Sequence, residues 1–248
     1  MFSNRYIFLY SSIMVIVVAA LLSLTALLLQ SRQEKNMTIA KIQGILAALN
    51  VEATMDDAEE LYGRYIKSEI VIDQDGQVAG IYQGGKMEKG SVRAFGLDLK
   101  KELYNKKMGE SYLSPLYIAE VDGKTIFIVP VRGVGLWGPL YGNIAFGPDF
   151  NEIIGAAFSH DKETPGLGAE IDKKEFSDQL IGKKIFDDSG KFNSILVVKG
   201  GASMLDPAMQ IHGIDAISGG TITSNGVGDM LKNCLENYLS YVKNNVKI

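Results

Sequence analysis

Residues 6–29 form an apolar run without a charged side chain, interrupted only by Ser11, Ser12, Ser23 and Thr25. A helix needs about 20 predominantly apolar residues to cross the hydrocarbon core of a bilayer. A cleaved signal peptide usually has an apolar core of about 7–15 residues followed by a small-x-small cleavage site. Because this run is longer and no clear Ala-x-Ala sequence follows it, the sequence predicts an uncleaved membrane-spanning helix.

The charges that flank this run bear on which side of a membrane the remaining chain occupies. Arg5 precedes the run, and Arg32, Lys35 and Lys41 follow it. Cytoplasmic segments beside a span are enriched in Lys and Arg. The charge count by itself therefore does not favour an extracytoplasmic domain.

The remaining chain is long enough for one sizeable domain, since the 248 residues are 46% apolar. The formal net charge is −4, with acidic and basic residues mixed along the chain. No basic stripe with interleaved aromatic residues occurs, so we expect no nucleic acid partner. His160, His212 and Cys234 are the only imidazole and thiol side chains. None has a partner at metal-ligand spacing, so we expect neither a metal site nor a catalytic triad.

Two Asp-Gly pairs, at 75–76 and 122–123, each separate two apolar runs and predict β-hairpins. The flanking runs are 70–72 and 78–82 for the first pair, and 116–121 and 125–131 for the second. Further strands are expected at 141–146 and, as a short buried strand, at 195–198.

Helices are expected before and after these strands. An apolar stripe continues over residues 39–49. Thr54 with Asp57 resembles a capping box that starts a second helix, whose inward-facing residues are expected to be Leu61, Tyr62, Tyr65 and Ile66. A last helix has Thr223 or Ser224 as its expected N-cap. Its apolar positions, at helical spacing, are Val227, Met230, Leu231, Cys234, Leu235, Tyr238, Leu239 and Val242.

The predicted fold is therefore α+β. It has one N-terminal transmembrane helix and one domain with an antiparallel, hairpin-built sheet and flanking helices. We expect the anchor and its juncture in residues 1–34 and the domain in residues 35–248.

Residues 133–138 match the dinucleotide-binding pattern Gly-x-Gly-x-x-Gly. That pattern requires a helix immediately after it, whose N-terminus holds the pyrophosphate. Here Pro139 and an expected strand follow, so we do not expect NADH to bind. The segment is better interpreted as a loop that presents Leu136 and Trp137, or as a glycine turn with Trp137 in the core.

Residues 215–227 place small and hydroxylated side chains directly before the last helix. The start of a helix offers free backbone N–H groups and the positive end of a dipole, so an anion is stabilised there. The simplest alternative is a capped helix after a glycine turn.

Three segments carry a resemblance to a known family. Residues 215–224 resemble the flavinylation motif Asp-x-x-Ser/Thr-Gly-Ala-Thr-x-Thr/Ser, residues 163–168 resemble its Glu-Thr-Pro-Gly-Leu-Gly signature, and residues 135–142 resemble its Gly-Leu-Trp segment. The family is the FMN-binding domain shared by the C subunit of the Na+-translocating NADH:quinone reductase and the G subunit of the related Rnf complex. The Gly-Leu-Trp segment favours the reductase branch over the Rnf branch.

The resemblance implies a site for covalent FMN, with a phosphoester to Thr221. Gly220 stands where the family usually has Ala. In the same way it implies that Leu136, Trp137, Thr164 and Leu167 meet the flavin ring. The other implied cofactor-binding residues are Ser218, Gly219, Gly220, Thr223, Glu163 and Gly166. Lys199, at the end of the expected strand 195–198, is a candidate counter-charge for the phosphate, the alternative being a solvated strand end.

The resemblance also implies a function. The chain would be a membrane-anchored electron carrier in the bacterial inner membrane, with its domain on the extracytoplasmic side. Its partners would be the lipid bilayer, the other subunits of the reductase and a flavin transferase, and it would not be catalytic alone. The alternatives are the G subunit of an Rnf-type complex, or a membrane-tethered binding or scaffold module that carries no flavin.

Overall fold

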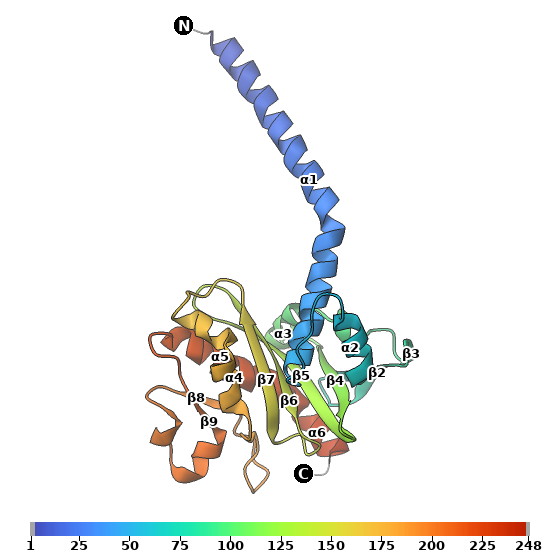
Figure 1. Ribbon diagram of the computed structural model, residues 1–248, viewed down its shortest axis with the longest axis vertical. Coiled ribbons are helices and arrows are strands. Elements are labelled where there is room, and N and C mark those ends of the chain that lie inside the picture. The colour runs from blue at the N-terminus through green and yellow to red at the C-terminus, as the bar shows by residue number, and fades with distance from the viewer. Residues whose placement is uncertain (1–2, 247–248) are drawn as a thin grey trace. The chain divides into compact units, whose positions relative to one another are not determined.

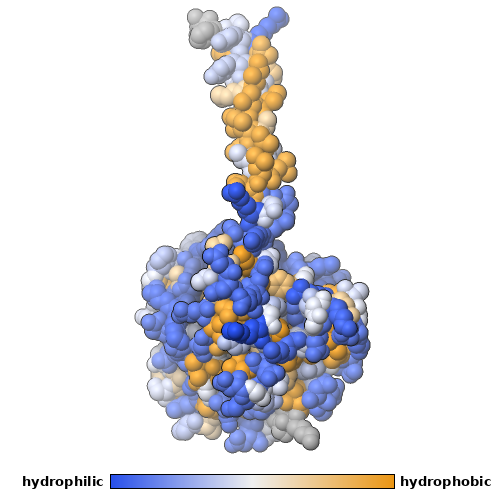
Figure 2. All heavy atoms as spheres, turned by 45° about the vertical axis from the view of Figure 1, so that its right-hand side comes forward, coloured by the Kyte–Doolittle hydropathy of each residue, from blue (hydrophilic) through white to orange (hydrophobic). Residues whose placement is uncertain are grey.

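The computed structural model describes residues 3–246, and the chain divides into two units, Met1–Ile42 and Gln43–Ile248. From Asn4 onward the first unit belongs to one long helix, α1 (Asn4–Ala47), which continues past residue 34, where the anchor and its juncture are expected to end (Figure 1). Apolar side chains gather along this helix and are exposed (Figure 2). Within the described residues, α1 is the one helix long and apolar enough to cross a membrane, as the sequence predicts.

The second unit is built on a seven-stranded antiparallel sheet with the order β3-β2-β1-β4-β5-β6-β7. The strands are β1 (Ile66–Asp73), β2 (Val78–Gln83), β3 (Lys86–Lys89), β4 (Leu113–Val121), β5 (Lys124–Val134), β6 (Pro139–Phe146) and β7 (Ile153–His160). Both expected hairpins are confirmed. Asp122 and Gly123 both have positive φ, 51° and 74°, which is the conformation of a type I′ turn. The sequence did not predict β3 or β7.

The helices of this unit are α2 (Ala58–Tyr65), α3 (Leu99–Met108), α4 (Lys174–Ser177), α5 (Thr221–Leu235) and α6 (Leu239–Asn245). The Asp57 carboxylate accepts a hydrogen bond from the Thr54 N–H at 2.6 Å, as in the expected capping box, but α2 begins at Ala58 with Asp57 as its N-cap, so the expectation that Thr54 caps this helix is wrong. The helix α2 ends at Tyr65, and Ile66 already begins β1. The α+β class is confirmed.

A separate parallel pair consists of β8 (Leu196–Val198) and β9 (Gly213–Asp215). The expectation of a buried strand at 195–198 is wrong in part, because Leu196 is exposed and only Ile195, which precedes β8, is buried. The strand lies at the surface because it pairs on one side only, with β9.

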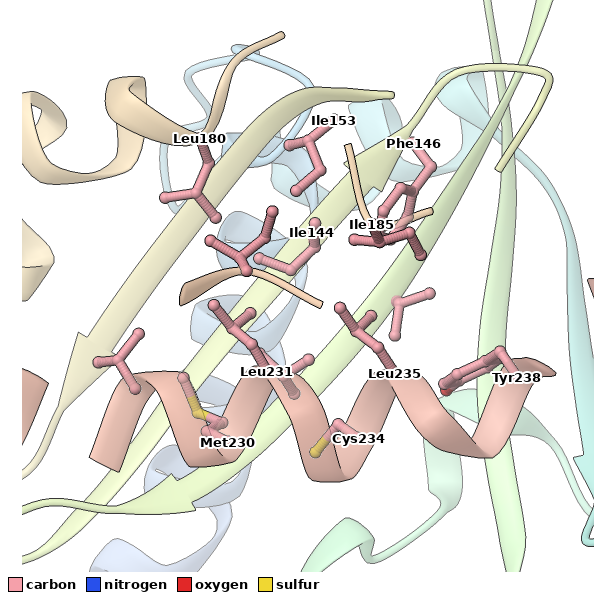
Figure 3. Close-up of a cluster of buried hydrophobic side chains, with 14 of the residues drawn as sticks. Ile144, Phe146, Ile153, Leu180, Ile185, Met230, Leu231, Cys234, Leu235 and Tyr238 are labelled. Atoms are coloured by element: carbon pink, nitrogen blue, oxygen red, sulfur yellow. The ribbon is translucent and has the colours of Figure 1, made fainter. Parts of the chain in front are cut away.

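The main core lies between the sheet and α5, whose apolar stripe is buried as expected (Figure 3). Successive residues of β4, Leu116 and Tyr117, belong to clusters on opposite faces, so the sheet is covered on both sides. The helix does not run unbroken to its end, because a 3-10 turn at Glu236–Tyr238 separates α5 from α6. Burial raises the pKa of the Cys234 thiol to about 11, which suits an unreactive core residue.

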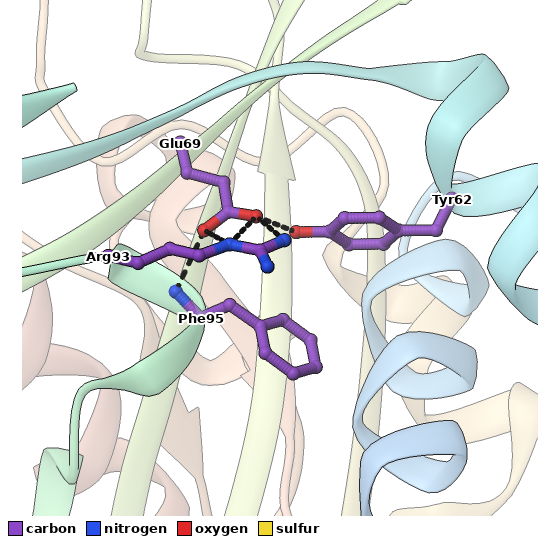
Figure 4. Close-up of polar contacts among 4 residues, drawn as sticks. All are labelled: Tyr62, Glu69, Arg93 and Phe95. Carbon is purple, nitrogen blue, oxygen red and sulfur yellow. Dashed lines mark hydrogen bonds and ion pairs between the residues drawn. The ribbon is translucent and has the colours of Figure 1, made fainter. Parts of the chain in front are cut away.

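On the other side of the sheet, the buried carboxylate of Glu69 fastens two segments to β1 (Figure 4). It accepts hydrogen bonds from the Arg93 guanidinium, from the Tyr62 hydroxyl at 2.8 Å and from the Phe95 N–H at 3.0 Å. The guanidinium also stacks over the Tyr82 ring, 4.0 Å from its centre. A buried charge satisfied in this way holds α2 and the loop before α3 in place.

Candidate functional site

The segment that precedes α5 is a tight turn over residues 217–220. The Gly220 N–H donates to the Ile217 carbonyl at 3.1 Å, and Gly219 has φ 76°, a conformation that favours glycine. The Ser224 hydroxyl accepts from the Ile217 N–H at 3.0 Å and ties the turn to the helix. These contacts orient the start of α5 against the turn.

The helix α5 begins at Thr221, and its N-cap is Gly220, without a side-chain cap. The expectation that Thr223 or Ser224 caps the helix is therefore wrong. The physical reason is that both hydroxyls have other partners: Ser224 is bound to Ile217, and Thr223 donates to Glu163.

The carboxylate of Glu163, only 5% exposed, joins three segments that are far apart in the sequence. One oxygen, Oε1, accepts from the Trp137 N–H at 2.8 Å, and the other, Oε2, accepts from the Thr223 hydroxyl at 2.6 Å. The loop before β6, the loop after β7 and the first turn of α5 therefore meet at one buried charge.

Two glycines leave room for this contact. A Cβ on Gly168 would collide with both Glu163 Oε2 and Thr223 Oγ1. A Cβ on Gly135 would lie 2.6 Å from Glu163 Oε1. Any side chain at either position would push the carboxylate away from its donors.

The Glu163 carboxyl is ionised in this setting. Burial raises its pKa, but hydrogen bonds from Thr223 and from the backbone of Trp137 and Gly138, with His160 nearby, outweigh that effect. The pKa of the carboxyl therefore lies below its ordinary value of 4.5.

Apolar side chains stand exposed around this cluster. Trp137 is 62% exposed, and Leu136 and Leu167 are exposed too, so the alternative that places Trp137 in the core is wrong. Leu167 lies against the turn before α5, because a Cβ on Gly219 would be 2.7 Å from its Cδ2 atom. Thr164 and Gly166 belong to the same exposed loop as Leu167, with Gly166 at φ 75°.

The two threonines of the motif differ in exposure. Thr221 is partly exposed at the first position of α5, whereas Thr223 is 1% exposed. Ser218 is exposed beside Gly219 in the turn. The remaining predicted residue, Lys199, is exposed just after β8, whose last residue pairs with Asp215.

Two exposed apolar residues, Ile222 in the first turn of α5 and Val134 at the end of β5, were not predicted as site residues from the sequence. The backbone of Val134 lies against Gly226 of α5, since a Cβ on that glycine would collide with the Val134 carbonyl. The sequence signal that could have found Ile222 is its place outside the apolar stripe of α5.

An accessible threonine at a helix start, with exposed apolar loops beside it, is the arrangement of a cofactor-binding domain. Residues 135–236 match the family described as FMN-binding domain. The chain is 33% identical to the C subunit of the Na(+)-translocating NADH-quinone reductase of Vibrio parahaemolyticus serotype O3:K6, over 86% of this chain and 83% of that protein. It is 32% identical to the corresponding protein of Pseudomonas aeruginosa PAO1, over 83% of this chain and 81% of that protein. The chain belongs to the family of C subunits of the Na(+)-translocating NADH-quinone reductase.

Solved structures agree with this assignment. The crystal structure of the C subunit from Parabacteroides distasonis ATCC 8503 matches with a TM-score of 0.74 and 39% identity, covering 86% of this chain and 96% of that one. That of Shewanella oneidensis NqrC matches with a TM-score of 0.65 and 26% identity, covering 84% and 99%. The family places the chain in an oxidoreductase complex, as a subunit with an FMN-binding domain and one apolar N-terminal helix.

Proposed function

We propose that this chain is a membrane-anchored electron-carrier subunit whose FMN is joined by a phosphoester to Thr221. The observation that carries the proposal is the difference between the two motif threonines. Thr221 is partly exposed, while the Thr223 hydroxyl is buried and already donates to Glu163 at 2.6 Å. A phosphoester on Thr223 would have to break that hydrogen bond inside a packed cluster.

The start of α5 suits the phosphate of such a cofactor. The Ser224 N–H is bound to the Gly220 carbonyl, and the N–H groups of Thr221, Ile222 and Thr223 precede it at the positive end of a 15-residue helix. An anion joined to Thr221 would be stabilised by these groups and by the helix dipole. We keep Ser218, Gly219 and Gly220 as the turn beside it, and Lys199 as a candidate counter-charge.

The exposed apolar side chains suit the flavin ring. Leu136, Trp137 and Leu167 offer flat or branched apolar surface, and Thr164 offers a hydroxyl, as a ring with apolar faces and polar edges requires. Glu163, Gly166 and Thr223 hold these loops in place. The bound flavin would supply the electron chemistry, while the protein sets its position, solvent access and potential.

Attachment would need a separate flavin transferase, since threonine is a poor nucleophile. With FAD as the donor, a bond would form between the Thr221 oxygen and the FMN phosphorus, and AMP would leave with the pyrophosphate bond broken. The hydroxyl proton would pass to a base of the transferase.

The proposed setting is the bacterial inner membrane, with residues 1–34 as anchor and juncture and residues 35–248 as an extracytoplasmic FMN domain. The apolar helix and the family support the anchor. Other subunits of the reductase would donate and accept the electrons, and the chain would not oxidise NADH alone.

Coexpression of the full chain with a flavin transferase tests the attachment site. Intact mass should show one FMN on the parent and none on Thr221→Ala. Thr223→Ser keeps the hydroxyl and should carry FMN like the parent. Retained FMN in Thr221→Ala would overturn the assignment. A parent without flavin fluorescence in a denaturing gel would instead favour the scaffold alternative.

A further inference from the structure

Glu163 is a buried charge whose hydrogen bonds all go to other parts of the protein. Both carboxylate oxygens are occupied, Oε1 by the Trp137 N–H and Oε2 by the Thr223 hydroxyl. Its own N–H donates to His160 Nδ1 at 3.2 Å. A carboxylate that is only 5% exposed and accepts from the protein at both oxygens is better placed to hold the surrounding loops than to contact a cofactor.

The partners of Glu163 lie on the segments that matter most for the proposed site. Trp137 belongs to the exposed loop proposed to meet the ring, and Thr223 lies two residues after the proposed attachment residue. The loop that follows Glu163 carries Leu167, which lies against Gly219 in the turn before α5. One side chain thus links the place where a flavin would be joined with the loops that would cover it.

We propose that Glu163 is the positioning residue of the flavin site. Its buried carboxylate holds the ring-facing loops and the first turn of α5 in fixed relative positions, and it leaves a fixed negative charge beside the flavin. This inference rests on the proposed function. Two consequences follow. Loosening the contact should change the surroundings of the ring while the phosphoester remains, and removing the charge should make the electron-rich reduced flavin easier to form.

The energetics favour a positioning role. Removing one partner of a buried, charge-assisted hydrogen bond leaves the other group desolvated and unpaired, which is more costly than the bond was favourable. Relieving that cost would require the loops to shift, because Gly135 and Gly168 pack directly against the same carboxylate. The surrounding backbone therefore cannot fill the space without moving the loops.

Four variants of the full chain, coexpressed with a flavin transferase, test the inference. Glu163→Gln removes the charge at nearly constant shape, and Thr223→Val removes one hydrogen bond at nearly constant shape. Thr223→Ser restores the hydroxyl. Asp161→Asn removes an exposed negative charge two residues from Glu163 and is the matched control for charge.

Intact mass, flavin fluorescence and midpoint potential are measured for each variant. Glu163→Gln and Thr223→Val should retain covalent FMN but fluoresce differently from the parent, and Thr223→Ser should return to the parental signal. The midpoint potential should move to more positive values in Glu163→Gln and stay parental in Asp161→Asn. A folded Thr223→Val chain that loses FMN would overturn the inference, because the phosphoester to Thr221 is expected to remain when the contact with Glu163 is lost.

Parental fluorescence and potential in both Glu163→Gln and Thr223→Val would overturn it. That outcome differs from a failure of the proposed function, in which the parent chain itself carries no covalent flavin. Thermal unfolding of each variant, followed by far-UV circular dichroism, separates a local change at the site from loss of the fold.

Discussion

Thr221 and Thr223 show how two residues of one type, two positions apart, can have different surroundings. Successive residues of an α-helix are rotated by about 100°, so two positions separate side chains by about 200°. Thr223 therefore points into the Glu163 cluster, and Thr221 remains partly exposed. Trp137 also combines a fixed part with an accessible part, because its backbone N–H is bound to Glu163 while its ring is exposed.

Trp137→Ala should leave the covalent flavin in place and make it more accessible to solvent. Because the ring is largely exposed, the free energy of unfolding should change by no more than about 0.5 kcal/mol. Iodide quenching of flavin fluorescence measures the accessibility. Tyr104→Ala, which removes another exposed aromatic ring, should match the parent. Equal quenching in the parent and Trp137→Ala would mean that Trp137 serves another surface.

Acidification should reveal the charge on Glu163. Since its pKa is lowered on folding, its contribution to stability is complete above the unfolded-state value and is lost as the pH falls through the folded-state value. At pH 7, Glu163→Gln should lower the free energy of unfolding by about 1–3 kcal/mol. The difference in Tm between parent and variant should shrink as the pH falls below 4.5. A difference independent of pH would contradict an ionised Glu163.

At the scale of elements, the turn 217–220 sets how the exposed loops meet α5. Gly219 needs its left-handed backbone and its missing Cβ, because Leu167 occupies the space beside it. Gly220 has an ordinary φ of −106°, and a Cβ there would meet Ile217 Cγ2 at 3.0 Å and the Gly168 nitrogen at 3.4 Å. Gly219 should therefore tolerate a side chain less well than Gly220.

Gly219→Ala should destabilise the chain by about 1–2 kcal/mol, the usual cost of a left-handed L-residue, and should displace Leu167. Gly220→Ala is the matched control, and it restores the residue that the motif usually has. Its effect should be smaller, because the reduced entropy of the unfolded chain, about 0.4–1 kcal/mol, offsets a small shift of Ile217. Chemical denaturation measures both, and equal losses in the two variants would contradict this distinction.

At the scale of the whole molecule, the main physical feature is the long stretch of α1 without charged residues. An 18-residue window of this helix has a mean hydropathy of 2.7, and none of it is buried. Such a surface is unfavourable in water and suits the hydrocarbon of a bilayer. The flanking charges do not favour the proposed extracytoplasmic domain, so that orientation would have to come from contacts with other helices of the complex.

A reporter fused to the C-terminus should be active outside the cytoplasm, and intact mass should include residues 1–29. The same reporter at the N-terminus is the control and should report the cytoplasm. A C-terminus protected from protease in spheroplasts would place the domain inside the cell. That result would remove the proposed location but leave the flavin attachment untouched.

Local sequence was sufficient for features that depend on near neighbours. The Asp75-Gly76 and Asp122-Gly123 turns, the apolar run of α1 and the buried stripe of α5 all follow from steric preference or periodicity within a few residues. In contrast, β7 contains the weak strand formers Gly155, Ala156 and Ala157, and its place in the sheet comes from pairing with β6.

Only the tertiary structure decided which polar groups meet. The contact between Glu163 and Thr223 spans 60 residues, and that with Trp137 spans 26. No periodicity encodes such contacts, because they depend on how the loops at the ends of β5, β6 and β7 are brought against α5. The sequence by itself determined a helix long and apolar enough to cross a membrane, a hairpin-built domain and the resemblance to the flavinylation motif. Folding decided that Thr223 is buried, that Thr221 and Trp137 are accessible, and that the buried carboxylate of Glu163 joins Thr223 to the backbone of Trp137.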